Sequence, residues 1–135
     1  MGYKIEEIEG IGPSFASKLA DADIATTDDL LKLCCDKKGR KSTSEKCGIG
    51  EGQLLKWANM ADLMRISGVG SEYSELLEAA GVDTVKELRN RNAANLAEKM
   101  AEVNEAKKLT RTVPSEKSVT DWVEQAKTLD PLITH

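Results

Sequence analysis

The sequence has few of the side chains on which enzymes commonly depend. Its one histidine, His135, is the last of the 135 residues, so no Ser-His or Cys-His pair can form inside a folded core. The segment Gly48-Ile49-Gly50-Glu51-Gly52 is rich in glycine, but no strand pattern precedes it and no Lys-Ser or Lys-Thr pair follows it. We therefore expect no enzyme, no cofactor and no small-molecule substrate.

Cysteine is also scarce. Cys34, Cys35 and Cys47 form an odd set, which suits reduced thiols in a reducing compartment. Two adjacent cysteines on a helix point in different directions, which is a poor arrangement for a tetrahedral zinc site. We expect small buried residues here and no metal.

Long apolar runs are missing. No apolar run follows Met1, and none approaches the length of a membrane span. The sequence therefore predicts a cytoplasmic protein with no signal peptide and no membrane partner.

Aromatic residues make up only 4% of the chain. The core must then come from Leu, Ile, Val, Ala and Met, and the remaining stretches are rich in Ala, Glu and Lys, which favours an all-α fold. Trp57 and Ala61 stand four residues apart, as do Trp122 and Ala126. We expect both tryptophans to pack in the core.

The chain does contain an internal repeat with an offset of 58 residues. Ile8 to Gly12 matches Ile66 to Gly70, and apolar and threonine positions continue in the same register as far as Leu30 and Leu88. One structural unit has been used twice. We predict a single domain over residues 1–135 that contains two pseudo-repeats, about 4–60 and 61–130.

Local signals mark the helices within this repeat. Pro13 suits the first position of a helix, and Phe15, Ala16, Leu19 and Ala22 then recur at helical spacing as its buried face. Thr26 and Thr84 each precede an acidic residue by three positions, as a capping box requires. We expect one helix over residues 58–66 and a basic loop over residues 37–42, with a further break before Pro114.

The two glycine hairpins resemble the helix-hairpin-helix motif. The matching residues are Gly10, Ile11, Gly12, Ala16 and Leu19 in the first copy, and Gly68, Val69, Gly70, Ser74 and Leu77 in the second. The stretches 59–66 and 72–82 look more narrowly like an uncharacterised bacterial family of tandem helix-hairpin-helix proteins. The resemblance implies duplicated units packed into one helical domain, with hairpin amides that bind nucleic-acid phosphates without reading sequence.

Charge favours the first hairpin as a phosphate site, although both hairpins lie in acidic stretches of a chain with net charge −4. Glu72 and Glu75 directly follow the second hairpin, so we expect Gly68, Val69 and Gly70 to be structural. Bases that could supply the missing positive charge also include Arg89, Arg91, Lys107, Lys108 and Arg111. The candidate nucleic-acid-binding residues are Gly10, Ile11, Gly12, Ser14, Lys18, Lys37, Lys38, Arg40 and Lys41.

Two functions remain open at this point. The first is a binding module that contacts nucleic acid weakly and without sequence preference. The second is a protein-interaction or scaffold module whose hairpins are purely architectural, because charged faces also steer association between proteins.

Overall fold

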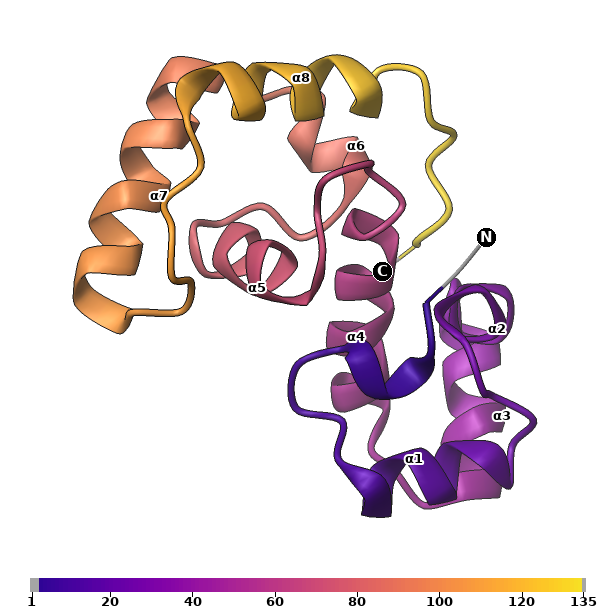
Figure 1. The fold of residues 1–135 in the computed structure, drawn as a ribbon. Helices are drawn as coiled ribbons and strands as arrows, with labels where there is room; N and C mark the ends of the chain where they lie inside the picture. The colour runs from indigo at the N-terminus through magenta and orange to yellow at the C-terminus, as the bar shows by residue number, and fades with distance from the viewer. Residues whose placement is uncertain (1–2, 135) are drawn as a thin grey trace. The chain divides into compact units, whose positions relative to one another are not determined.

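The computed structural model describes residues 3–134, and every regular element within them is helical (Figure 1). The prediction of an all-α fold is confirmed. The elements are η1 (Ile5–Glu7), α1 (Pro13–Ala20), α2 (Thr27–Cys34), α3 (Lys37–Cys47), α4 (Glu51–Leu63), α5 (Ser71–Ala79), α6 (Val85–Leu88), α7 (Ala93–Lys107) and α8 (Glu116–Ala126). Within the described residues, no helix is long and apolar enough to cross a membrane.

The chain forms two compact units. Unit 1 comprises the described residues up to Asp62 together with those from Leu132 onward, and unit 2 comprises Leu63–Pro131. The division lies two residues from the predicted boundary between the pseudo-repeats. The arrangement of both as a single domain stays a prediction.

Unit 1 is tied together at its beginning by main-chain bonds. The N–H of Ile5 donates to the carbonyl of Ala25 (3.0 Å), and the N–H of Thr27 donates to the carbonyl of Tyr3 (2.9 Å). Thr26 then caps α2 with a reciprocal capping box that involves Asp29. These bonds fix the start of the chain against the start of α2.

The last described residues form a short strap on unit 1. The N–H of Thr134 donates to the carbonyl of Cys35 (2.8 Å), and its carbonyl accepts from Nη2 of Arg40 (2.8 Å). The Arg40 guanidinium also donates to the carbonyl of Cys34 (3.1 Å). Ile133, the residue before Thr134, is buried, so the strap adds an apolar side chain as well as backbone partners.

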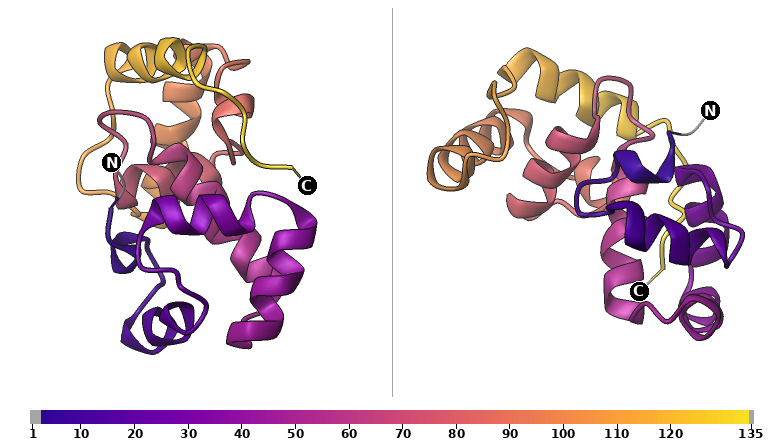
Figure 2. Two further views of the ribbon diagram at one scale, coloured as in Figure 1. Left: turned by 90° about the vertical axis from the view of Figure 1, so that its right-hand side faces the viewer. Right: turned by 60° about the horizontal axis from the view of Figure 1, so that its bottom comes forward.

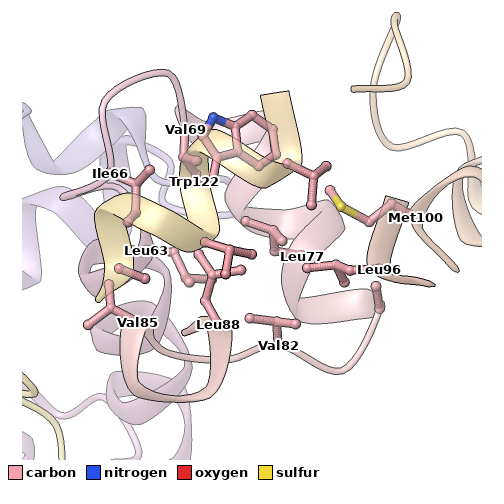
Figure 3. Packing of buried hydrophobic residues seen from close by; sticks show 14 of the residues in the cluster. Leu63, Ile66, Val69, Leu77, Val82, Val85, Leu88, Leu96, Met100 and Trp122 are labelled. Atoms are coloured by element: carbon pink, nitrogen blue, oxygen red, sulfur yellow. The ribbon is translucent and has the colours of Figure 1, made fainter. Parts of the chain in front are cut away.

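Unit 2 places α5 and α6 against α7 and α8 (Figures 1 and 2). Its core is a cluster of aliphatic side chains closed by one indole, Trp122 (Figure 3). The labelled members in that view are Leu63, Ile66, Val69, Leu77, Val82, Val85, Leu88, Leu96, Met100 and Trp122. Few aromatic residues are needed because these aliphatic side chains come from every helix of the unit.

Most local signals in the sequence locate the helices correctly. Pro13 is the first residue of α1, and both Thr26 and Thr84 are N-caps whose side chains accept a main-chain N–H. Trp57 and Trp122 are buried, with exposed fractions of 2% and 4%, so their prediction as core residues is confirmed.

Two local predictions need correction. Phe15 is 37% exposed and does not belong to the buried face of α1, because its ring lies on the outside of Trp57 at a centroid distance of 5.1 Å. The helix predicted over residues 58–66 instead begins at Glu51 and ends at Leu63. A turn follows in which the N–H of Ile66 donates to the carbonyl of Leu63 (3.1 Å).

Candidate functional site

The two glycine hairpins have matching backbone geometry. We define hairpin 1 as Gly10, Ile11 and Gly12, and hairpin 2 as Gly68, Val69 and Gly70. The first glycine has a φ of 94° in hairpin 1 and 97° in hairpin 2. In both hairpins the central residue donates its N–H to an isoleucine carbonyl three residues earlier, at 3.1 Å. A side chain at the first glycine would therefore be strained in either copy.

Each hairpin has a pair of packed aromatic rings next to its first glycine. The rings of Phe15 and Trp57 pack at 5.1 Å, and so do those of Tyr73 and Trp122. The indole nitrogen of Trp122 lies 3.1 Å from the place where a Cβ on Gly68 would stand. Figure 3 shows this indole beside Val69 of hairpin 2.

The helices that follow the hairpins begin without a side-chain cap. Both α1 and α5 have glycine at the N-cap, whereas five other helices are capped by Thr26, Asp36, Thr84, Asn92 and Ser115. In α5 the first bond of the helix joins the N–H of Ser74 to the carbonyl of Gly70 (2.9 Å). The amides of Glu72 and Tyr73 precede that bond, so they have no acceptor within the helix. An uncapped helix start favours an anion.

Two hollows lie at hairpin 2. The first, the arginine hollow, has a volume of about 450 Å³ and is lined by Gly68, Gly70, Ser71, Glu72, Tyr73, Thr110, Arg111 and Thr112. The second, the indole hollow, has a volume of about 390 Å³ and is lined by Ser67, Gly68, Tyr73, Pro114, Lys117, Ser118, Asp121 and Trp122. The loop between α7 and α8, which runs back alongside α7 in Figure 1, therefore brings Arg111 to the start of α5.

Comparison with known protein families gives one match. A family model described as a domain of unknown function, DUF4332, matches residues 9–129. The chain belongs to this family. A search of curated proteins and a search of solved structures gave no match. The DUF4332 match spans both hairpins, both hollows and α8.

In this DUF4332 chain the basic segment predicted as a loop is helical. Residues 37–42 form the first turns of α3, which Asp36 caps by accepting the N–H of Gly39 (2.7 Å). A run of lysines around a glycine indicates a loop when read alone, but the aspartate before it supplies the cap that starts a helix. The prediction of a basic loop over residues 37–42 was wrong.

The predicted basic residues do not gather at hairpin 1. Arg40 is only 3% exposed, and its guanidinium is held by the carbonyls of Cys34 and Thr134, so it is withdrawn from the candidate interface. Lys37, Lys38 and Lys41 are exposed on α3, which lies on the other side of unit 1 from the loop through hairpin 1 (Figure 1). Ser14 and Lys18 are exposed on α1, and the Lys18 ammonium lies 5.7 Å from the centre of the Phe15 ring.

No sequence signal selects the basic residues that lie at hairpin 2. Arg111 is one of several bases that the sequence leaves without a location, and no motif includes Lys117. The available signal was the extra segment before Pro114, which has no counterpart in the first repeat. An insertion that follows a helix and ends in a proline indicates a loop that can fold back over the preceding elements.

The cysteines are free thiols. Cys34 and Cys47 are buried, and Cys35 is partly exposed. Burial raises the pKa of the Cys34 thiol above its ordinary value. Among residues 3–134, no group of three His, Cys, Asp or Glu side chains is placed to hold a metal ion.

Proposed function

We propose that this chain is a non-enzymatic module of helix-hairpin-helix type, built from two copies of one unit, that binds nucleic-acid phosphates without reading sequence. The observation that carries the proposal is the uncapped start of α5 beside Arg111 in the arginine hollow. Main-chain amides and a guanidinium are both donors that suit phosphate oxygens.

The matching geometry at positions 58 residues apart supports the duplicated unit. Besides the two hairpins, the N–H of Ile24 donates to the carbonyl of Leu19 (3.0 Å), and the N–H of Val82 donates to the carbonyl of Leu77 (2.9 Å). The caps Thr26 and Thr84 hold the same register. Local sequence and local structure therefore repeat together.

Hairpin 2 has a better supply of positive charge than hairpin 1. Arg111 and Lys117 line its two hollows, whereas Glu6, Glu7 and Glu9 are exposed just before hairpin 1. Glu72 also lines the arginine hollow and opposes an anion there. With net charge −4, binding is expected to be weak and to fall steeply as salt rises.

The test is a fluorescence anisotropy titration of a labelled oligonucleotide at several salt concentrations. Arg111→Gln should weaken binding and make the plot of log affinity against log salt shallower by about 0.7 to 0.9 if one phosphate contact is lost. Lys18→Gln is the matched control at hairpin 1 and should leave both values unchanged. Absence of binding at low salt, or equal effects of the two variants, would refute the proposed site.

The surface at hairpin 1 favours a second candidate function, a contact with a basic protein. Glu6, Glu7 and Glu9 are exposed in the residues just before hairpin 1, and Phe15, just after it, is 37% exposed. A pull-down should then retain a protein partner in a manner that depends on Phe15 and is unchanged by Arg111→Gln. Recovery of nucleic acid with no protein would count against this candidate.

A further inference from the structure

We propose that hairpin 2 takes one nucleotide of a single strand, with its phosphate in the arginine hollow and its base in the indole hollow. This inference rests on the proposed function, and it adds the class of nucleic acid that the site prefers.

The two hollows adjoin and share two residues. Gly68 and Tyr73 line both of them, and the volumes are about 450 and 390 Å³. Each volume lies within the range of sites for small molecules. A ligand with a charged group and an adjacent planar group could therefore occupy both hollows and contact Tyr73, which lines each of them.

A hydrogen-bond donor, the indole N–H of Trp122, belongs to a residue that lines the indole hollow. The Trp122 side chain lines this hollow and is 4% exposed, and its indole nitrogen lies next to Gly68. Because an indole nitrogen is a donor only, it suits an acceptor atom supplied by a ligand in this hollow.

The other polar groups of the indole hollow suit a neutral base better than a second phosphate. Lys117 supplies a cation and Asp121 a carboxylate, which already accepts one hydrogen bond from Nε2 of Gln125 (2.8 Å). A nucleobase edge carries both acceptors and donors, so it can use the indole N–H, the ammonium and the carboxylate together. A phosphate would be repelled by Asp121.

Tyr73 provides the apolar surface for the base. Its ring is partly buried against Trp122 at a centroid distance of 5.1 Å and an interplanar angle of 51°. Aromatic side chains stack on bases of any sequence. A base within a duplex is paired and stacked, so it could enter the hollow only after it is pulled out of the helix. The site should therefore prefer a single strand.

The indole N–H groups give a direct measurement, because the chain has two tryptophans. We would titrate ¹⁵N-labelled protein at low salt with a thymidine ten-mer, its RNA counterpart, and a DNA duplex of equal length. The Trp122 indole cross-peak should shift with the single strands, while the Trp57 cross-peak in unit 1 should stay in place. The peaks are assigned from a Trp57→Phe variant.

Two matched variants test the base contact. Tyr73→Leu should weaken single-strand binding by roughly 5- to 150-fold, the loss expected for one stacked base. Phe15→Leu removes the corresponding ring at hairpin 1 and should leave affinity unchanged. Lys117→Gln changes an exposed side chain of the indole hollow and should weaken single-strand binding more than duplex binding, which keeps the test valid if Tyr73→Leu fails to fold.

The outcomes separate this inference from the proposed function. If duplex and single strands bind equally, neither indole shifts, and Arg111→Gln still weakens binding, phosphate binding stands and the base site is overturned. If no oligonucleotide binds, both proposals fail. Preference for single strands with a shift of the Trp122 peak supports both, and the DNA and RNA arms show which sugar is favoured.

Discussion

Substituting the first glycine of each hairpin with alanine tests whether the two hairpins are held in the same way. Gly10 and Gly68 have φ values of 94° and 97°, so alanine at either position costs about 1–3 kcal/mol in backbone strain. At Gly10 the new Cβ would lie 3.8 Å from the indole nitrogen of Trp57, which is an ordinary contact. We therefore expect Gly10→Ala to lower the free energy of unfolding by the strain alone.

Gly68→Ala should cost more. Its Cβ would stand 3.1 Å from the indole nitrogen of Trp122, so the ring must shift within a packed core. Overpacking of that kind adds about 1–3 kcal/mol. The total expected loss of unfolding free energy is about 2–6 kcal/mol, the sum of the strain and packing costs.

The second glycine of each hairpin provides the control. Gly12 and Gly70 have φ values of −89° and −99°, and an added Cβ would meet nothing within 4 Å. Alanine at either position should change the unfolding free energy by less than about 1 kcal/mol, because the loss of a favoured N-cap residue opposes the gain in chain stiffness. Urea unfolding followed by circular dichroism gives all four values. Equal midpoints for Gly68→Ala and Gly70→Ala would refute the reasoning.

Three further predictions concern unit 1. Arg40→Gln should lower the unfolding free energy by about 1–3 kcal/mol in urea titrations, because two carbonyls lose a charged donor, whereas Lys41→Gln on the exposed face should be neutral. A hydrogen bond from the N–H of Ala25 is the main reason that the pKa of Asp29 lies below its ordinary value. The Asp29 carboxylate therefore stabilises the fold above about pH 4, and this stabilisation is lost as the pH falls through the lower pKa of the folded state. Asp29→Asn should make the melting temperature depend less on pH in this acidic range. In the folded protein a thiol reagent at pH 8 should modify Cys35 quickly and Cys34 slowly, and equal rates would contradict the burial that raises the pKa of Cys34.

The parts of the fold that sequence predicts well are those set by neighbours in the chain. Thr26 and Thr84 mark helix starts by accepting the N–H three residues later, and Pro13 does so through its fixed φ, so the pattern alone is enough. The helical class follows in the same way from the spacing of apolar residues. The 58-residue offset of the repeat agrees with these local signals.

The parts that sequence misses depend on residues far apart. Buried Arg40 donates a hydrogen bond to a carbonyl 94 residues later, and nothing near Arg40 in the sequence indicates this partner. The arginine hollow exists because Thr110 to Thr112 return to a helix start about 40 residues earlier. Charge counted along the chain favours hairpin 1, but it cannot reveal that Arg111 and Lys117 line the hollows at hairpin 2.

The strap on unit 1 has a consequence for chain topology. Because unit 1 takes Leu132 and its successors from beyond Pro131, unit 2 is connected as an insertion within unit 1. A tandem repeat would be divided into two complete halves by one cut, but a cut after Asp62 leaves the first fragment without Ile133 and without the carbonyl that Arg40 binds. A stand-alone unit 1 therefore requires the strap to be rejoined through a linker, whereas unit 2 can be produced as one continuous piece.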